Sequence, residues 1–115
     1  YSGRFGGYRG REAIAAMFRT YMRTPAHFAL NVHFLCSETI VVSPDALSAD
    51  ASWVMLQTST FADQKSHLNA AQLTLKLRSE DGHWRIALFQ TENLFSRPTS
   101  AWNSSALLPV PAQDS

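Results

Sequence analysis

The hydrophobic pattern of this chain changes its period once, near residue 30, and this change limits the folds that the chain can adopt. Before it, apolar residues recur every three or four positions along residues 11–23, which predicts a helix with one apolar face. That face carries Ile14, Met17, Phe18 and Tyr21. After it, the sequence is rich in β-branched and aromatic residues and reads as extended strands. A helix followed by a series of strands indicates an α+β fold.

Four strands are expected in this second part, and short turns separate them. The predicted strands cover residues 32–43, 49–61, 67–78 and 83–95. Asp81-Gly82 is a strong signal for a hairpin turn. Consecutive strands on short turns predict an antiparallel meander. The glycine-rich residues 1–10 read as the end of a strand or a loop that leads into the helix, and Thr24-Pro25 is expected to end that helix.

The single helix is too short to cover such a sheet. A helix of 13 residues spans only about 20 Å. We therefore expect a segment that precedes Tyr1, a partner chain, or both to cover the rest of the sheet. Residues 1–98 are expected to form one domain, and residues 99–115, which are rich in proline and serine, are expected to form a C-terminal surface extension.

Composition excludes several classes of function. The chain has 115 residues, of which 45% are hydrophobic, and this fits one folded domain. A net charge of +1 argues against a dedicated nucleic-acid-binding protein and against a polybasic membrane-surface protein. No apolar run has the length of about 20 residues that a membrane span needs. Cys36 is the only cysteine, which excludes an intrachain disulfide and is compatible with the cytoplasm, where we expect the protein to be. The histidines and acids do not show metal-ligand spacing, so no metal site is expected.

Three stretches of the sequence together resemble a known family. They are Tyr8-Arg9-Gly10-Arg11-Glu12-Ala13-Ile14, Val32-His33-Phe34-Leu35 and Asp81-Gly82-His83-Trp84-Arg85-Ile86. In this order and spacing they are similar to the SnoaL-like branch of the nuclear transport factor 2-like superfamily. The resemblance implies a cone-like α+β barrel, in which a strongly bent antiparallel sheet is wrapped around helices and encloses an apolar pocket. Such domains usually begin with two helices and a short strand before the Gly-Arg-Glu-Ala-Ile helix, so we expect that this sequence lacks the N-terminal helices of its family.

The same resemblance implies a role for His33. Dehydratase-like relatives place a histidine at this position facing the pocket, where a carboxylate from an N-terminal helix pairs with it. An imidazole can accept a proton at neutral pH, and a carboxylate partner would orient the ring. This sequence shows no such carboxylate. His33 is therefore either the base of a catalytic site or a structural histidine.

Strand alternation adds candidate binding residues to His33. If His33 faces the pocket, Leu35, Ser37, Thr39 and Val41 share its face, while Phe34, Ile40 and Val42 face outward. In the last strand, Gln90 and Glu92 share an otherwise apolar face with Trp84, Ile86 and Leu88. This polar pair either binds a ligand or meets solvent near the strand end. Tyr21 would add a polar group from the helix.

These expectations lead to two hypotheses about function. In the first, the protein is a dehydratase, isomerase or cyclase that needs no cofactor and acts on an apolar cyclic molecule. His33 would be the base, and Tyr21, Leu35, Ser37, Gln90 and Glu92 would contact the substrate. In the second, the protein is a non-catalytic ligand-binding or assembly module of the same fold. In both, we expect a homodimer that associates through the outward face of the sheet, at Phe34, Ile40 and Val42 and at residues of the strands 66–78 and 83–95.

Overall fold

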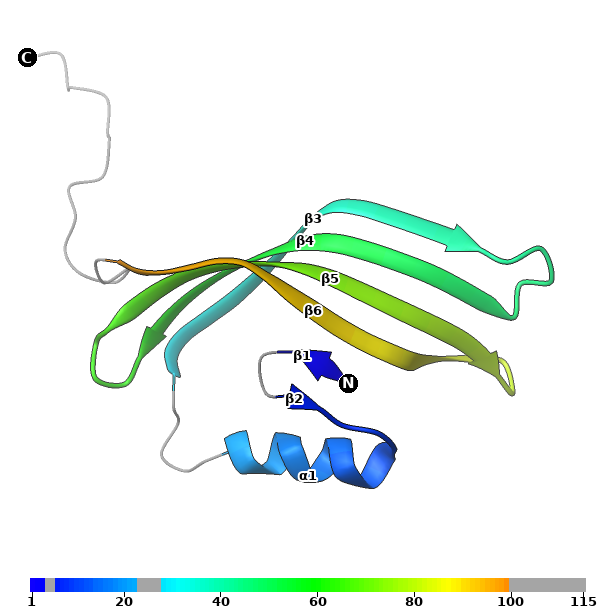
Figure 1. Cartoon of the computed structure of the whole chain (residues 1–115), viewed down its shortest axis with the longest axis horizontal. Helices are drawn as coiled ribbons and strands as arrows, with labels where there is room; N and C mark the ends of the chain where they lie inside the picture. The colour runs from blue at the N-terminus through cyan, green and yellow to red at the C-terminus, as the bar shows by residue number, and fades with distance from the viewer. Residues whose placement is uncertain (4–5, 23–27, 100–115) are drawn as a thin grey trace, which may run out of the picture.

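The computed structural model describes residues 1–3, 6–22 and 28–99, apart from the side chain of Tyr21, and these residues form a curved sheet with one helix (Figure 1). The predicted helix and all four predicted strands are confirmed, with ends that differ by a few residues. The elements are β1 (Ser2–Gly3), β2 (Gly6–Gly7), α1 (Arg11–Tyr21), β3 (Phe28–Val42), β4 (Ser48–Phe61), β5 (Ser66–Glu80) and β6 (His83–Thr99).

The sheet has six strands in the order β2-β1-β6-β5-β4-β3. β3 to β6 form the antiparallel meander that the sequence predicts. β1, however, pairs in parallel with β6 through Ser2 and Gln90, so the sheet is mixed and not purely antiparallel. The sheet is also open, because β2 and β3 lie at opposite edges. The α+β class is therefore confirmed, but among the described residues the sheet is mixed and open, and not the wholly antiparallel cone-like barrel that the resemblance implies.

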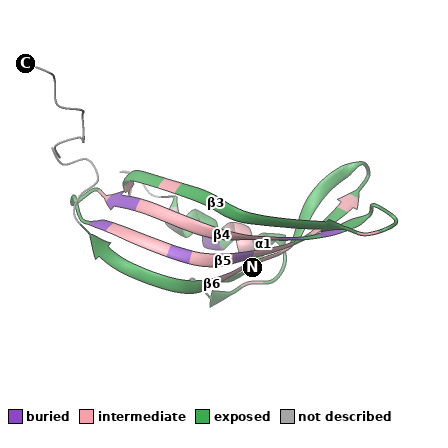
Figure 2. Ribbon diagram, turned by 90° about the horizontal axis from the view of Figure 1, so that it is seen from above, coloured by how far each residue is buried: buried purple, intermediate pink, exposed green. Residues whose placement is uncertain are grey.

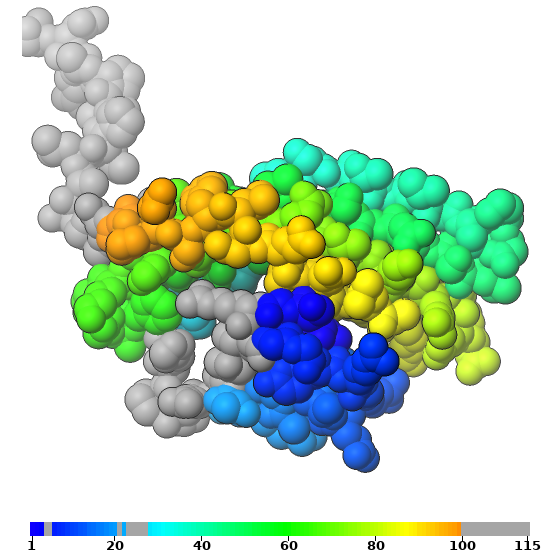
Figure 3. All heavy atoms as spheres, in the orientation of Figure 1, coloured from blue at the N-terminus to red at the C-terminus, as the bar shows by residue number. Residues whose placement is uncertain are grey.

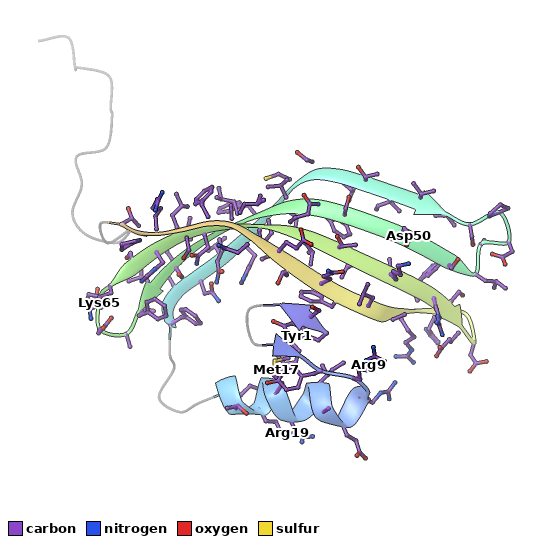
Figure 4. The ribbon with its side chains drawn as sticks, viewed as in Figure 1. Tyr1, Arg9, Met17, Arg19, Asp50 and Lys65 are labelled. Carbon is purple, nitrogen blue, oxygen red and sulfur yellow. The ribbon has the colours of Figure 1, made fainter. Side chains whose placement is uncertain are left out.

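The sheet is strongly bent, and α1 lies on its concave side together with β1 and β2 (Figure 1). Aromatic packing joins these parts. The ring of Tyr1 stacks on that of Phe89 in β6 at 5.7 Å, with an interplanar angle of 11°. The ring of Phe18 in α1 meets Tyr1 edge-on at 6.2 Å. Met17 is the buried residue of α1, at 4% exposure, and Figure 4 shows it on the side of the helix that faces β1 and β2.

Two tight turns close the meander in the way that their residues predict. Asp81 and Gly82 both have positive φ, 50° and 77°, as a two-residue hairpin turn between β5 and β6 requires. In the turn between β3 and β4, the hydroxyl of Ser43 donates to Asp45 Oδ1 at 2.5 Å, and the backbone N–H of Leu47 donates to the same atom at 3.0 Å. These two hydrogen bonds lower the pKa of Asp45 below its ordinary value of 3.8. The predicted stop at Thr24-Pro25 lies outside the described residues.

The strand register shifts at four places, at Ala29 and Ser37-Glu38 in β3 and at Ala87 and Leu94 in β6, and each shift interrupts the alternation of side chains. The shifts at Ser37-Glu38 and Ala87 change the predicted faces, and the shift at Leu94 returns Ser96 to the face of its partner Asn69. In β3, Cys36 pairs with Val54 and Thr39 pairs with Ser52, so Ser37 and Glu38 together oppose a single residue of β4. Ser37 has a φ of 53°. In β6, Ile86 and Leu88 pair with consecutive residues of β5, so Ala87 is the extra residue. Each bulge exchanges the faces of all residues beyond it.

The bulge in β3 overturns part of the predicted face assignment. Cross-strand partners share a face, and Ile40 and Val42 pair with the buried residues Ala51 and Ala49. Ile40 and Val42 therefore lie on the concave face with His33, and Thr39 and Val41 lie on the convex face. The sequence predicts the reverse, because simple alternation does not include the extra residue at Ser37 and Glu38.

Among the described residues, few apolar side chains are buried. They are Met17, Ala49, Ala51, Ala70 and Leu73. The buried residues of the sheet lie in the central strands β4 and β5, whereas β3 and β6 are largely exposed (Figure 2). Figure 3 shows that α1, β1 and β2 cover the middle of the concave side, and that the sheet extends beyond them toward the β3–β4 and β5–β6 turns.

Candidate ligand-binding cleft

A cleft of about 500 Å³ lies on the concave face, between the sheet and the segment that holds β1 and α1. Its apolar lining is mostly aromatic and consists of Tyr1, Phe18, Phe28, Met55, Leu73 and Phe89. Its polar lining consists of Asn31, His33, Gln57 and Thr91. Figure 4 shows Tyr1 between the sheet and α1. A cleft of this volume, with an apolar wall and a few polar groups, has the size and character of a small-molecule site.

His33 reaches this cleft from β3, where it pairs across the sheet with Gln57. His33 is exposed to solvent. No carboxylate of the described residues forms an ion pair or a hydrogen bond with it. Glu38, at the bulge of the same strand, is five residues away, or about 16 Å along an extended chain. Its Oε1 instead accepts a hydrogen bond of 3.2 Å from Trp53 Nε1.

The polar residues beside His33 form a hydrogen-bonded pair. Gln57 Nε2 donates to Asn31 Oδ1 at 2.7 Å. This bond joins β4 to β3 and holds both amides at the wall of the cleft. Sequence reasoning missed Asn31, Gln57 and Thr91. The available signal was an amide side chain within each of two otherwise apolar strand segments, at positions that alternation places on the face of His33.

A second cleft, of about 370 Å³, adjoins the first on the same face. Met55, Gln57 and Thr91 line both clefts. The remaining lining of the second cleft consists of Asn69, Ala70, Ala71, Asn93 and Ser96. The hydroxyl of Ser96 donates to Asn69 Oδ1, which joins β6 to β5. The concave face therefore carries an aromatic region and, next to it, a region of neutral polar side chains.

The structure separates the predicted binding residues. Leu35 pairs with Met55 and so lies on the face of His33, at the exposed edge of the sheet. Ser37 lies in the bulge of β3. Tyr21 ends α1, but its side chain lies outside the described residues.

Gln90 and Glu92 lie on the convex face, opposite His33. They pair with Thr74 and Gln72, whereas the cleft residue Thr91 between them pairs with Leu73. The predicted common face of Gln90 and Glu92 with Trp84 and Ile86 is wrong, because the bulge at Ala87 shifts the alternation of β6 by one residue.

Within the part of the chain that the structure describes, no three histidine, cysteine or acidic side chains come together in a group that could hold a metal ion. Over the same residues, no helix is both long enough and apolar enough to cross a membrane.

The fold is similar to those of several solved structures. A hexachlorocyclohexane dehydrochlorinase, LinA type 2, matches with a TM-score of 0.67 and 17% identity over 96% of this chain and 70% of that one. A candidate scytalone dehydratase from Novosphingobium aromaticivorans DSM 12444 matches with a TM-score of 0.66 and 13% identity over 90% and 73% of the two chains. A candidate aromatic ring hydroxylase from Novosphingobium aromaticivorans matches at 0.56 and 11% identity over 64% of this chain, which spans only 51% of that protein.

At these identities, the structural similarity establishes the fold alone. No curated protein sequence matches the chain. The model of the SnoaL-like domain family, however, matches residues 1–90, which include α1, the meander up to the middle of β6, and His33. The resemblance drawn from the three sequence stretches is thereby confirmed, and the chain belongs to the SnoaL-like domain family, within the nuclear transport factor 2-like superfamily.

Proposed function

We propose that this protein binds a small, largely apolar cyclic molecule in the cleft on the concave face. The observation that carries the proposal is the aromatic wall of the cleft, in which Tyr1, Phe18 and Phe89 are in ring contact. Aromatic rings bury a large area and stack on flat ligands. His33, Asn31 and Gln57 would orient the ligand through hydrogen bonds at the opposite wall.

For catalysis, we propose a proton transfer in which His33 is the base and no cofactor takes part. His33 would remove a proton from a carbon atom of the bound ligand. In an elimination, the electron pair of that C–H bond would form a double bond as a halide or hydroxyl group leaves the neighbouring carbon. The similarity in fold to a dehydrochlorinase and to a candidate dehydratase supports this class of reaction, as does the position of an imidazole at the cleft wall.

The alternative is that the cleft binds its ligand without catalysing a reaction. One observation favours it: among the described residues, no carboxylate pairs with His33. A base without an orienting partner loses the fixed ring position on which efficient proton transfer depends. His33 would then act as a hydrogen-bonding group for the ligand.

The substitution His33→Gln distinguishes these two functions. Hexachlorocyclohexane and scytalone, which the names of the similar proteins suggest, are the first probes. Binding is followed by tryptophan fluorescence, and turnover by release of chloride or formation of the dehydrated product. If His33 is the base, the variant should lose about 10²–10⁴-fold in turnover while it still binds the probe. His83→Gln, at the exposed start of β6, is the matched control and should behave as the wild type.

Three outcomes decide between the hypotheses. A loss of turnover below tenfold would reject His33 as the base. Binding of a probe without turnover in the wild type would favour the non-catalytic module. If neither these probes nor other apolar cyclic compounds bind to the wild type, the proposal of a ligand cleft fails.

A further inference from the structure

We propose that the ligand of this cleft is electrically neutral and carries hydroxyl or carbonyl groups, which a row of four polar side chains across the sheet would bind. This inference rests on the proposed function and adds the chemical class of the ligand. The row consists of His33, Gln57, Asn69 and Ser96, one residue from each strand of the meander.

The register of the strands aligns these four residues. His33 pairs with Gln57, Gln57 pairs with Asn69, and Asn69 pairs with Ser96. Direct cross-strand partners have Cβ atoms about 4.5–5.5 Å apart and point to the same face. The row therefore crosses the concave face at a right angle to the strands. It passes from the aromatic cleft, which His33 and Gln57 line, into the second cleft, which Gln57, Asn69 and Ser96 line.

The hydrogen bonds within this region leave binding capacity unused. Gln57 gives one of its two amide protons to Asn31, and Asn69 accepts the proton of Ser96. Gln57 Oε1, Asn69 Nδ2 and the ring nitrogens of His33 make no hydrogen bond to another described residue. A carboxamide has two donor protons and an acceptor oxygen, and an imidazole can both donate and accept. The row thus offers donors and acceptors side by side, a pattern that hydroxyl and carbonyl groups can match.

The linings of the two clefts argue against a charged ligand. Among the described residues, no lysine, arginine, aspartate or glutamate lines either cleft. A carboxylate or ammonium group would therefore lose part of its hydration without gaining an opposite charge, which is strongly unfavourable. A neutral hydroxyl or carbonyl group would exchange its hydrogen bonds with water for bonds to the amides, at little net cost.

Three naphthalene derivatives of similar size test this inference at pH 7. They are naphthalene, 2-naphthol and 2-naphthoate, which present an apolar edge, a neutral hydroxyl and a carboxylate on the same ring system. Dissociation constants are measured by calorimetry and by tryptophan fluorescence on the chain described here. We expect 2-naphthol to bind about three- to tenfold more tightly than naphthalene, as one additional hydrogen bond allows. We expect 2-naphthoate to bind more weakly than 2-naphthol by tenfold or more.

Substitution of Asn69 tests whether the row of polar side chains causes the preference for 2-naphthol over naphthalene. Asn69→Leu keeps the size of the side chain but removes its polar atoms, and it should bring 2-naphthol to the affinity of naphthalene without changing the affinity for naphthalene. Gln72→Leu, on the same strand but on the convex face opposite Glu92, is the matched control and should leave the affinities for all three compounds unchanged. If Asn69→Leu does not fold, Gln57→Met makes the same test in the row.

The outcomes separate this inference from the proposed function. If naphthalene and 2-naphthol bind equally, or if 2-naphthoate binds most tightly, the cleft stands as a ligand site but the inference of a neutral hydrogen-bonding ligand is wrong. The same conclusion follows if Asn69→Leu and Gln57→Met both keep the preference for 2-naphthol. If none of the three compounds binds to the wild type, the result contradicts the proposed function and the inference together.

Discussion

Among the described residues, the largest side chains that are fully buried, Thr60 and Ser59, are both polar. Thr60 is 0% exposed, and its Oγ1 lies 2.9 Å from the hydroxyl of Ser66, which is 2% exposed. Thr60 and Ser66 are also direct partners at the end of β4 and β5. A buried hydroxyl without a partner loses its hydration without compensation. Each of these two hydroxyls therefore depends on the other for its hydrogen bond.

We therefore expect Thr60→Val to destabilise the protein by about 1–3 kcal/mol, because it leaves the Ser66 hydroxyl buried and unpaired. Urea unfolding of the variant gives this value. The double variant Thr60→Val/Ser66→Ala removes both hydroxyls and should recover part of the stability that Thr60→Val loses. The two single variants and the double variant together form a double-mutant cycle, which measures the interaction between the hydroxyls. If the two single effects simply add up in the double variant, the hydroxyls do not depend on each other and the assignment is wrong.

At the scale of elements, the sequence is sufficient for the helix and the four long strands but not for the faces of the strands. The apolar spacing of α1 and the turn residues Asp81-Gly82 act locally, and the structure follows them. Bulges are different, because an extra residue in one strand is defined only by the register of its neighbour. Nothing local distinguishes Ser37 or Ala87 from a regular strand residue. Simple alternation therefore predicts one face for Gln90, Glu92, Trp84 and Ile86, which the bulge at Ala87 divides, and it misses Thr91.

The bulge in β3 limits which residue types fit at position 37, and this limit can be tested. A φ of 53° is strained for most residues, most of all for β-branched ones, but not for glycine. We expect Ser37→Val to lower the free energy of unfolding by about 1–2 kcal/mol, and Ser37→Gly to leave it unchanged or raise it slightly. Thermal or urea unfolding measures both variants.

Thr39, just beyond the bulge, provides the matched control because it pairs regularly with Ser52. Here the order should be the opposite: Thr39→Val should be tolerated, and Thr39→Gly should cost about 0.5–1 kcal/mol. If valine is preferred over glycine at both positions, residue 37 does not have the left-handed conformation, and the faces assigned to Ile40 and Val42 must be exchanged.

At the scale of the whole molecule, both faces of the sheet expose apolar side chains. On the convex face, one row crosses the meander from Phe34 through Leu56 to Phe95, by way of Ala70, which also borders the second cleft because the register shifts beside it. Phe34 and Phe95, at the two ends of this row, are 49% and 40% exposed. An apolar row of this length on an exposed sheet face is typical of an interface. A closed pair with two-fold symmetry, in which the same row meets its copy, is the simplest arrangement that buries it.

We therefore propose a homodimer that associates through the convex face around Phe34, and no longer through Ile40 and Val42, which lie on the concave face. Phe34→Glu should dissociate the dimer, because each subunit would bring a charge into the centre of an apolar contact. Ile40→Glu is the matched control: Ile40 is 51% exposed on the same strand but on the other face, so the dimer should persist.

Sedimentation velocity at micromolar concentration measures the oligomeric state of both variants and of the wild type. A monomeric wild type would reject the dimer. Dissociation by Ile40→Glu but not by Phe34→Glu would place the interface on the concave face, where it would compete with the ligand cleft.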